Sequence, residues 1–342
     1  MSKIVFLSNI YTPYQHDWLR ELSKNHNVLG IFVKEKEKNR NWNIEKDSIF
    51  KILSGNLIKK YLSIIKEIHN MRPEHLIIGG YAERGTNLAH LIGALYGAKI
   101  YYWAERPIRH RKGILGYLKK TILTIKLGSA NKVFAIGELA REYYSQFNKN
   151  TINYPYTCDL NDFYNLKSNN ENKKVNILFS GQYIERKNVL NLLNAFLNVN
   201  DSSLRLTLIG GGDLIDEMRN YSSDSISIKG FMQRECMIKE FQNNDVFILP
   251  SKHDGWALVI NEALAAGMFV LSNQNVGAFV DFQAEINCID CGDTIEQVES
   301  SFKKLVHINN IKQKGEENRN FIKNSIADLE NSIKFINLQL TN

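Results

Sequence analysis

Two carboxylates stand eight residues apart in the segment 245–272, DVFILPSKHDGWALVINEALAAGMFVLS. An apolar strand is predicted to end at Pro250, after which a loop presents Asp254 and a helix carries Glu262. If the stretch between the two acids is fully helical, at 1.5 Å per residue, they lie roughly 12 Å apart. They could therefore bracket a diphosphate, and each could accept hydrogen bonds from hydroxyl groups beside it.

The start of that predicted helix is itself a candidate phosphate site. Gly255 lets the backbone turn, and the amides of Trp256, Ala257, Leu258 and Val259 follow at the helix start. The first N–H groups of a helix have no partner within the helix, and the helix dipole is positive at that end. The segment therefore predicts a site that holds a diphosphate without a metal.

The elements that position these residues alternate along the chain. Short apolar segments that alternate with helical ones indicate parallel sheets with helices on both faces. Strands are predicted at 3–8, 27–33, 75–80, 99–105, 132–137, 175–181, 204–212, 226–230, 245–251 and 268–272, with helices between most of them.

One polar segment divides this pattern. Residues 165–174, NLKSNNENKK, carry almost no apolar side chain and predict a linker. We therefore expect an α/β protein with two doubly wound, Rossmann-like domains, 1–165 and 166–320, that face a cleft. Residues 321–342 predict one amphipathic helix that packs back on the first domain.

Length and composition agree with this organisation and exclude other classes. The 342 residues are 44% hydrophobic and 23% charged, which is typical of globular domains and not of disordered or collagen-like chains. No run is long and apolar enough for a membrane span, and the start does not resemble a signal peptide, so we expect a cytoplasmic protein. Cys288 and Cys291 have C-x-x-C spacing but read as a strand that enters a turn, which disfavours a zinc or redox site.

The charge is distributed unevenly. The net charge is +7, with +11 in residues 1–165 and −4 in residues 166–342. Residues 106–132 carry eight Lys and Arg and no acid, interleaved with apolar residues. This pattern predicts a basic amphipathic helix that either contacts an anionic membrane or a phosphate-rich ligand, or is an ordinary solvated helix. Nucleic-acid binding ranks last, since no recognisable nucleic-acid-binding motif accompanies the charge.

At 250–267, PSKHDGWALVINEALAAG, the sequence resembles the retaining glycosyltransferases of family 4, which have the GT-B fold. The shared frame is a strand, Pro-Ser, an acid and Gly, a helix with Glu-Ala, Gly and a strand. Asp254 stands where the family usually has the first Glu of its E-x7-E pair, and Ala257 where it often has Gly. The resemblance implies that Glu262 accepts hydrogen bonds from the donor ribose and Asp254 from the transferred sugar.

The resemblance extends to the other loops of the second domain. FSGQYIERKNVLNLLNAF, from 179 to 196, is similar to the family segment whose basic residues, here Arg186 and Lys187, hold the donor diphosphate. Gly181 opens that turn, and Gln182 stands where many members have Arg. The Gly-rich turn LIGGGDLIDEM and the segment ISIKGFMQ also match. The resemblance implies donor contacts at the residues that these two segments contribute, Gly211 and Phe231.

In the first domain the resemblance implies acceptor or sugar contacts. TPYQH, with Tyr14 and His16, takes the place of a Gly-Gly pair that many relatives have after the first strand. Glu105, Arg106 and His110 follow a strand end that faces the cleft in the family, and here surface roles are equally open to them.

The resemblance implies a metal-independent transferase with no cofactor beyond its nucleotide-sugar donor. It would move a hexose or N-acetylhexosamine, from a UDP-sugar by preference or from GDP-mannose, to a glycan acceptor in surface polysaccharide or lipopolysaccharide assembly. The acceptor could be linked to a lipid diphosphate, with the protein peripheral on the inner face of the plasma membrane. The alternative is a non-catalytic nucleotide-sugar-binding partner of another transferase.

Overall fold

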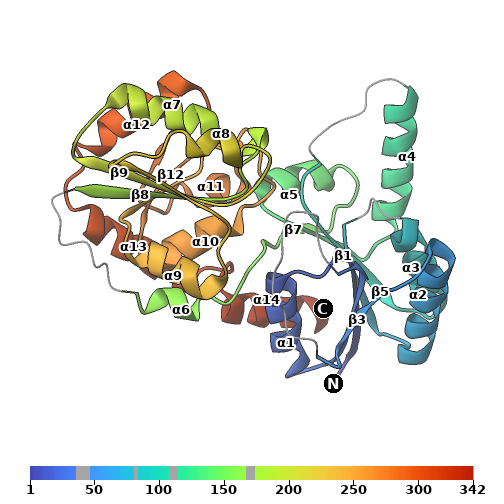
Figure 1. Ribbon diagram of the computed structural model, residues 1–342. Coiled ribbons are helices and arrows are strands. Elements are labelled where there is room, and N and C mark those ends of the chain that lie inside the picture. The colour runs from blue at the N-terminus through green and yellow to red at the C-terminus, as the bar shows by residue number, and fades with distance from the viewer. Residues whose placement is uncertain (36–46, 81–83, 108–113, 167–173, 342) are drawn as a thin grey trace. The chain divides into compact units, whose positions relative to one another are not determined.

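The computed structural model describes residues 1–35, 47–80, 84–107, 114–166 and 174–341, which form two compact units (Figure 1). Unit 1 comprises Met1–Cys158 and Leu329–Asn342, and unit 2 comprises Asp159–Asp328. The chain thus passes between units at 158/159 and 328/329, where the sequence predicted borders at 165/166 and 320/321. Most of the predicted linker 165–174 lies outside the described residues.

Unit 1 contains a seven-stranded parallel sheet in the order β3-β2-β1-β4-β5-β6-β7. The strand order reverses between β1 and β4, so the loops after these two strands diverge there. The strands are β1 Lys3–Ile10, β2 Asn27–Lys34, β3 Phe50–Ile52, β4 His75–Gly79, β5 Lys99–Ala104, β6 Lys132–Ala135 and β7 Thr151–Asn153.

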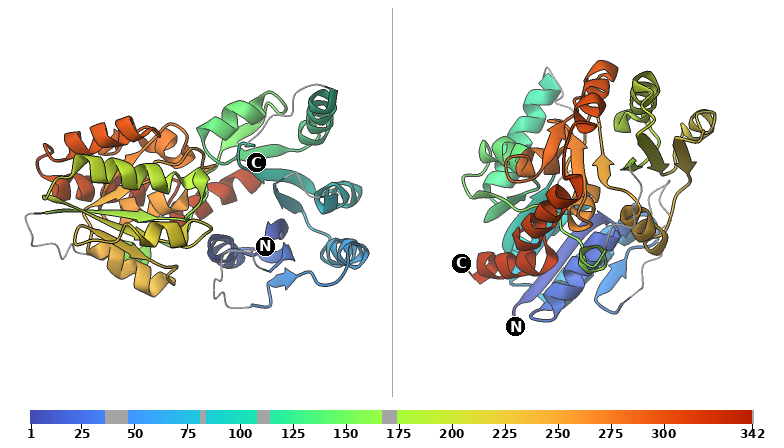
Figure 2. Two further views of the ribbon diagram at one scale, coloured as in Figure 1. Left: turned by 45° about the horizontal axis from the view of Figure 1, so that its top comes forward. Right: turned by 90° about the vertical axis from the view of Figure 1, so that its left-hand side faces the viewer.

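Helices cover both faces of this sheet, because successive side chains of a buried strand point to opposite sides. Val5 and Leu7 of β1 pack in the core that includes Ile64, whereas Phe6 packs against the ring of Trp18. On the Trp18 face, α14 lies beside α1 (Figures 1 and 2). The helices of unit 1 are α1 Pro13–Ser23, α2 Leu57–Met71, α3 Arg84–Leu95, α4 Ile114–Gly128, α5 Glu138–Ser145 and α14 Leu329–Thr341.

Unit 2 repeats the architecture with a six-stranded parallel sheet in the order β10-β9-β8-β11-β12-β13. Its order reverses between β8 and β11. The strands are β8 Val175–Ser180, β9 Leu204–Ile209, β10 Ile226–Lys229, β11 Val246–Ile248, β12 Phe269–Ser272 and β13 Cys288–Asp290. The helices are α6 Asn161–Tyr164, the short 3₁₀ helix η1 Glu185–Lys187, α7 Val189–Val199, α8 Ile215–Arg219, α9 Arg234–Gln242, α10 Leu258–Ala265, α11 Gly277–Phe282, α12 Ile295–Leu305 and α13 Ile311–Asn324.

The prediction of a single C-terminal helix over 321–342 is wrong. Two helices occupy this stretch, α13 and α14, and the chain between them is extended at Ser325. The Ser325 hydroxyl accepts a hydrogen bond from the amide of Ala327 at 3.1 Å, and the side chain of Ala327 is fully buried. A serine that bonds to a nearby amide competes with the helical pattern, which explains the break.

Candidate functional site

The predicted basic residues and one predicted acid meet where the strand order of unit 2 reverses. Arg186 and Lys187 lie on the loop after β8, and Asp254 lies on the loop after β11. The Lys187 ammonium forms an ion pair with Asp254 Oδ2, and the two side chains are only 9% and 14% exposed. Arg186 Nη1 lies 3.9 Å from the same oxygen and donates a hydrogen bond to the carbonyl of His253 at 2.8 Å. Two cations and one carboxylate therefore form a single cluster.

Asparagine amides hold the loops of this cluster in place. Asn188 adopts a left-handed backbone conformation, with φ of 62°, directly after η1. Its side-chain amide donates to the carbonyls of Pro250 at 3.0 Å and Asp293 at 2.7 Å. Asn273 likewise donates to the carbonyls of Ser251 at 3.2 Å and Gly292 at 2.7 Å.

Sequence reasoning missed these asparagines. The available signal was their position: Asn273 directly follows a buried strand, and Asn188 directly precedes an apolar helix. Their amides connect the loops that follow β8, β11, β12 and β13, and so fix the carboxyl edge of the sheet.

The glycines after β8 and β9 bring two backbones into contact. A side chain at Gly210 would place its Cβ 1.8 Å from the carbonyl oxygen of Gly181, so only glycine fits there. Tyr183 donates its amide to the carbonyl of Gly211 at 2.9 Å, which joins the two loops. A Cβ at Gly211 would lie 3.9 Å from Phe231, whose side chain is 46% exposed. The structure thus brings the predicted Gly181, Gly211 and Phe231 together.

The helix α10 begins beside Asp254 in an unusual backbone conformation. Ala257, at its N-cap, has φ of 74° and ψ of 72°, a left-handed conformation that favours glycine. The amide of Ile260 donates to the carbonyl of Ala257, whereas the amides of Leu258 and Val259 have no acceptor within the described part of the chain. The first turn of α10 therefore offers two free N–H groups at the positive end of a helix dipole.

Trp256 contributes to this helix start only through its backbone. Its indole is 1% exposed and packs edge-on against Phe282, with ring centroids 5.3 Å apart. Gly255 is partly exposed, and its backbone lies close to that of Gly277, where a Cβ would lie 2.2 Å from the Gly255 carbonyl oxygen. Gln182 is partly exposed on the loop after β8, and its backbone carbonyl accepts a hydrogen bond from the amide of Ile184.

Glu262 lies one turn into α10 and carries the other predicted carboxylate. Burial raises the pKa of this carboxyl to about 7, and the charge of Arg234 opposes that shift in part. Across residues 174–341 and the other described ranges, no side chain or amide makes a hydrogen bond or ion pair with it. Glu262 therefore keeps its full capacity to accept hydrogen bonds from a ligand once it is ionised.

In unit 1 the predicted acceptor residues fall into two groups. Tyr14 packs against Tyr156 with ring centroids 4.7 Å apart. Burial raises the pKa of Tyr156 well above its usual value, and the charge of Glu105 adds to that shift, so Glu105 belongs to the same neighbourhood. Trp103 packs edge-on against Tyr156 at 5.0 Å. These residues form an aromatic cluster with one nearby acid.

The other predicted acceptor residues are not part of that cluster. His16 is buried, its Nδ1 lies 3.0 Å from Asp17, and its ring packs against Phe50 at 5.0 Å. Arg106 is partly exposed, and His110 lies outside the described residues.

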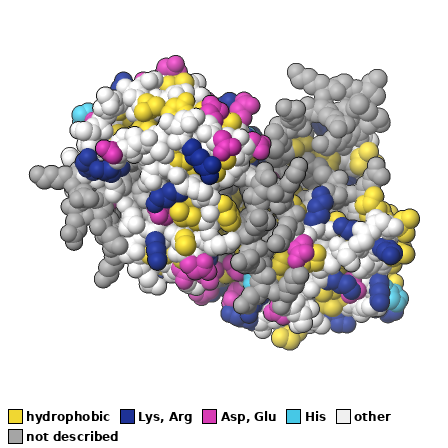
Figure 3. All heavy atoms as spheres, viewed as in Figure 1, with side chains coloured by type: hydrophobic (Ala, Val, Ile, Leu, Met, Phe, Trp, Pro, Cys, Tyr) yellow, Lys and Arg dark blue, Asp and Glu magenta, His cyan; other side chains and the backbone are white. Residues whose placement is uncertain are grey.

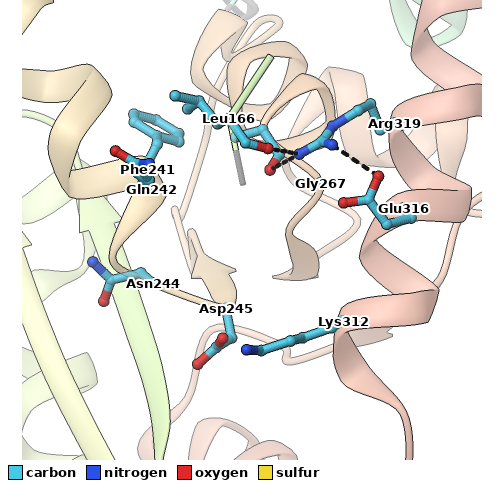
Figure 4. Close-up of a pocket in the computed structure, with 10 residues that line it drawn as sticks. Leu166, Phe241, Gln242, Asn244, Asp245, Gly267, Lys312, Glu316 and Arg319 are labelled. Atoms are coloured by element: carbon cyan, nitrogen blue, oxygen red, sulfur yellow. Dashed lines mark hydrogen bonds and ion pairs between the residues drawn. The ribbon is translucent and has the colours of Figure 1, made fainter. Parts of the chain in front are cut away.

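A cavity at the opposite end of the unit 2 sheet lacks the features of the predicted site (Figure 4). Its lining includes Asp245, which precedes β11, and Gly267, which precedes β12, so it lies at the amino ends of those strands. Arg319 there donates to the carbonyls of Ala265, Ala266 and Leu166 at 2.7 to 2.9 Å. The bonds to Ala265 and Ala266 satisfy carbonyls at the C-terminal end of α10, which is a structural role.

Two negative findings complete the description. Within the described ranges, no group of three or more His, Cys, Asp or Glu side chains is placed to hold a metal ion. No helix among the described residues is both long and apolar enough to cross a membrane.

Comparison with known proteins gives a family match that lies within unit 2. Residues 162–328 match the model of the family described as glycosyl transferases group 1. A curated relative, an uncharacterised 41.2 kDa protein in the cps region of Klebsiella pneumoniae, is 28% identical over 179 residues, which are 49% of this chain. The chain spans about half the length of that relative, 48%.

Solved structures resemble the whole chain. The structure of HepE from Anabaena in complex with UDP superimposes with a TM-score of 0.75 at 12% identity and covers 99% of both chains. WaaG, a glycosyltransferase involved in lipopolysaccharide biosynthesis, gives a TM-score of 0.68 at 14% identity, covering 97% of this chain and 99% of that one. The predicted α/β class with two doubly wound units of the GT-B type is confirmed.

Proposed function

We propose that this chain, whose residues 162–328 match the group 1 family, is a retaining glycosyltransferase of family 4 that uses a nucleoside diphosphate sugar. The observation that carries the proposal is the cluster of Lys187, Arg186 and Asp254 beside the free amides of α10. Two cations and a helix start at a strand-order reversal are the features that bind a diphosphate in open parallel sheets.

The donor would lie on unit 2. Its diphosphate would accept hydrogen bonds from the amides of Leu258 and Val259 and would be neutralised by Arg186 and Lys187. Glu262, ionised, would accept hydrogen bonds from the ribose hydroxyls, and Phe231 would lie at the nucleobase. A UDP-sugar is favoured, because HepE, a protein of the same fold, was crystallised with UDP. GDP-mannose is the second donor to test.

Each group at this site would assist the bond changes of transfer. The bond between the anomeric carbon of a hexose or N-acetylhexosamine and the diphosphate oxygen breaks, and an acceptor hydroxyl oxygen forms a bond to that carbon. If the hydroxyl attacks the face from which the diphosphate leaves, configuration is retained and its proton passes to the departing phosphate. The charge that develops on the diphosphate meets Lys187, Arg186 and the amides, each such donor being worth roughly 3 to 4 kcal/mol. This assignment requires no metal.

Asp254 has a partner within the protein. Its ion pair with Lys187 orients the ammonium, and a hydroxyl of the transferred sugar would have to share or replace that contact. The carboxylate would thus both position Lys187 and bind the sugar.

Unit 1 would bind a saccharide acceptor in surface polysaccharide or lipopolysaccharide assembly. The cps location of the curated relative and the role of WaaG in lipopolysaccharide biosynthesis support this class. Tyr14, Tyr156 and Glu105 offer stacking surfaces and a hydroxyl acceptor, which suit a sugar. The positive charge of this half of the chain suits an acceptor linked to a lipid diphosphate at the inner face of a membrane.

The second candidate function is a nucleotide-sugar-binding partner without activity of its own. The observation that favours it is Asp254, which replaces the usual Glu and is held by Lys187. Saturable nucleotide binding without turnover on any acceptor would select this alternative.

Calorimetric titration with UDP, GDP, ADP and their common sugar conjugates, with and without a chelator, tests the proposal. We expect tight binding of one nucleoside diphosphate that is insensitive to the chelator. The variant Glu262→Ala should lose this binding, whereas Glu217→Ala, an exposed acid on α8, should keep it. Absence of binding to every nucleotide would overturn the donor site, and binding that persists in Glu262→Ala would remove Glu262 from it.

A further inference from the structure

Three neighbouring helices of unit 1 carry most of the exposed hydrophobic side chains of the described residues. Among all the described residues, twelve large hydrophobic side chains are exposed. Eight of these twelve lie on α2, α3 or α4 or directly after one of them. Their exposed fractions run from 40% to 80%, the largest being that of Leu95. The eight are Leu57, Ile58, Leu62, Leu91, Leu95, Tyr96, Ile122 and Ile125. Single exposed leucines are common, but such a concentration marks an interaction surface.

Helices α2 and α3 pack against each other, and α4 contacts α3, which makes a layer of three helices. Between α2 and α3, a Cβ at Gly85 would touch Ile64 at 3.1 Å, and His69 Nδ1 lies 2.6 Å from the hydroxyl of Tyr96. Between α3 and α4, Lys126 donates to the hydroxyl of Thr86 at 2.9 Å. The inner sides of the helices bury Ile64, Ile68, Ala89, Leu123 and Leu127 against the sheet, so the exposed residues form the outer surface.

The charge of this layer is almost entirely positive. The three helices contain seven Lys and Arg and one acid, Glu67, which forms an ion pair with Lys51. Lys59, Lys66 and Lys120 are exposed, beside the hydrophobic residues. Figure 3 shows hydrophobic side chains next to those of lysine and arginine at the right of the molecule, over α2 and α3. By contrast, α1 carries Asp17 and Glu21.

We infer that the outer surface of α2, α3 and α4 docks on an anionic lipid bilayer. Lysines would pair with lipid phosphates, while the aliphatic side chains enter the boundary between headgroups and acyl chains. A second copy of the chain is a poorer occupant, because two surfaces of the same charge would repel each other. The helices would lie on the membrane and not cross it, since none among the described residues is long and apolar enough to span it.

This inference rests on the proposed function in one respect: a lipid-linked acceptor would give the protein a reason to bind a membrane. Binding to vesicles is measured without donor or acceptor. Failure of vesicle binding would therefore leave the transferase proposal intact, and an inactive but vesicle-binding protein would leave the docking surface intact.

Sedimentation with vesicles of phosphatidylcholine containing 30% phosphatidylglycerol tests the surface. The wild type should bind these vesicles and bind pure phosphatidylcholine at least tenfold more weakly. The double variants Ile58→Ser/Leu62→Ser and Leu91→Ser/Leu95→Ser should each lower the partition coefficient about tenfold or more, and so should Lys59→Gln/Lys66→Gln.

Matched controls separate this surface from general hydrophobicity. Leu338→Ser on α14, where the leucine is 62% exposed, and Leu197→Ser on α7 should not change the partition coefficient. Unchanged thermal unfolding midpoints show that the variants are folded. Equal binding to neutral vesicles, or partition coefficients that the α2 and α3 variants leave unchanged, would overturn the inference. So would a dimer in light scattering that these same variants dissociate.

Discussion

The two units have the same reversal of strand order but present different chemistry at it. In unit 2 the loops after β8 and β11 present the pair Lys187 and Asp254, with asparagine amides that fix the backbone. In unit 1, Tyr14 follows β1 at the start of α1 and packs against Tyr156, which follows β7. A charged, amide-rich edge suits a diphosphate, whereas an aromatic edge suits a sugar ring. One sheet topology can thus present different ligand chemistry through its loops alone.

The strongest test of this comparison removes the buried cation of unit 2. Lys187→Met should lower the rate of transfer about 10²- to 10³-fold, as for loss of one preorganised donor. It should also lower the free energy of unfolding by about 2 to 3 kcal/mol, because Asp254 is left without its main partner in a mostly buried site. Steady-state kinetics and urea unfolding measure both effects.

Lys252→Met is the matched control for that variant. Lys252 lies on the same loop as Asp254, but its ion pair with Glu185 is exposed and should contribute at most about 1 kcal/mol. Equal losses in the two variants would contradict the assignment of the diphosphate to Lys187.

The next largest effect is on the free energy of unfolding, at the close contact between the loops after β8 and β9. Gly210→Ala would place a methyl group against the carbonyl of Gly181 and should lower the free energy of unfolding by about 3 kcal/mol. Gly230→Ala meets no atom within 4 Å and should cost less than about 1 kcal/mol. Urea unfolding of both variants checks this, and nearly equal midpoints would show that the loops are not tightly joined.

The pKa of Glu262 predicts how donor binding depends on pH. With a pKa of about 7, this carboxyl is about one-tenth ionised at pH 6 and nine-tenths ionised at pH 8, so donor affinity should rise about tenfold over that range. Glu262→Gln should bind weakly with no rise. Titrations at three pH values measure this, and a rise that survives in Glu262→Gln would point to another group.

The carboxyl of Glu262 also makes stability depend on pH. Donor affinity should rise with pH, whereas the contribution of Glu262 to stability should fall. Its pKa in the folded protein is raised from 4.5 to about 7, so the native state binds more protons than the unfolded state between these values. The contribution of Glu262 to stability therefore falls as pH rises from about 4.5 to 7. Comparing the urea midpoints of the wild type and Glu262→Gln across this range isolates it.

A change in unit 1 should affect the acceptor alone. Tyr14→Ala removes one ring of the aromatic pair and should raise KM for the acceptor about fivefold, which corresponds to about 1 kcal/mol of stacking. The Kd of the donor should stay the same. A change in donor affinity in Tyr14→Ala would contradict the assignment of the acceptor to unit 1 and the donor to unit 2.

The smallest expected effect concerns backbone strain. Ala257→Gly should raise the free energy of unfolding by about 1 kcal/mol, because glycine adopts a φ of 74° without steric cost. Arg72→Gly, at a φ of 45° in unit 1, should give a gain of similar size or smaller. Thermal unfolding compares them, and a loss of stability in Ala257→Gly would show that Ala257 is not strained.

The sequence predicts the regular parts of both units, because buried strands and amphipathic helices have clear periodicity. It misses β3 and β7, whose three residues each, FKI and TIN, include polar side chains and form no apolar run. It also misses the break at Ser325, since an apolar pattern continues on both sides of it.

At the site, the sequence predicts which loops are involved and not how their side chains pair. The left-handed backbone at Ala257 is not predicted, although the resembling family often has Gly there. The pairing of Lys187 with Asp254 depends on two loop conformations 67 residues apart, which local patterns do not determine. The amide bonds of Asn188 and Asn273 are equally non-local.

The return of the chain to unit 1 has a consequence for synthesis on the ribosome. Trp18 donates to the Tyr154 hydroxyl at 2.8 Å, which in turn lies 2.7 Å from the hydroxyl of Ser332 on α14. Unit 1 thus lacks a buried partner until residues after 328 have been translated, whereas unit 2 is continuous in sequence. Although domains generally fold from the N-terminus onward, here the later unit can finish first. During synthesis, the core of unit 1 therefore stays incomplete until unit 2 and then α14 have been translated.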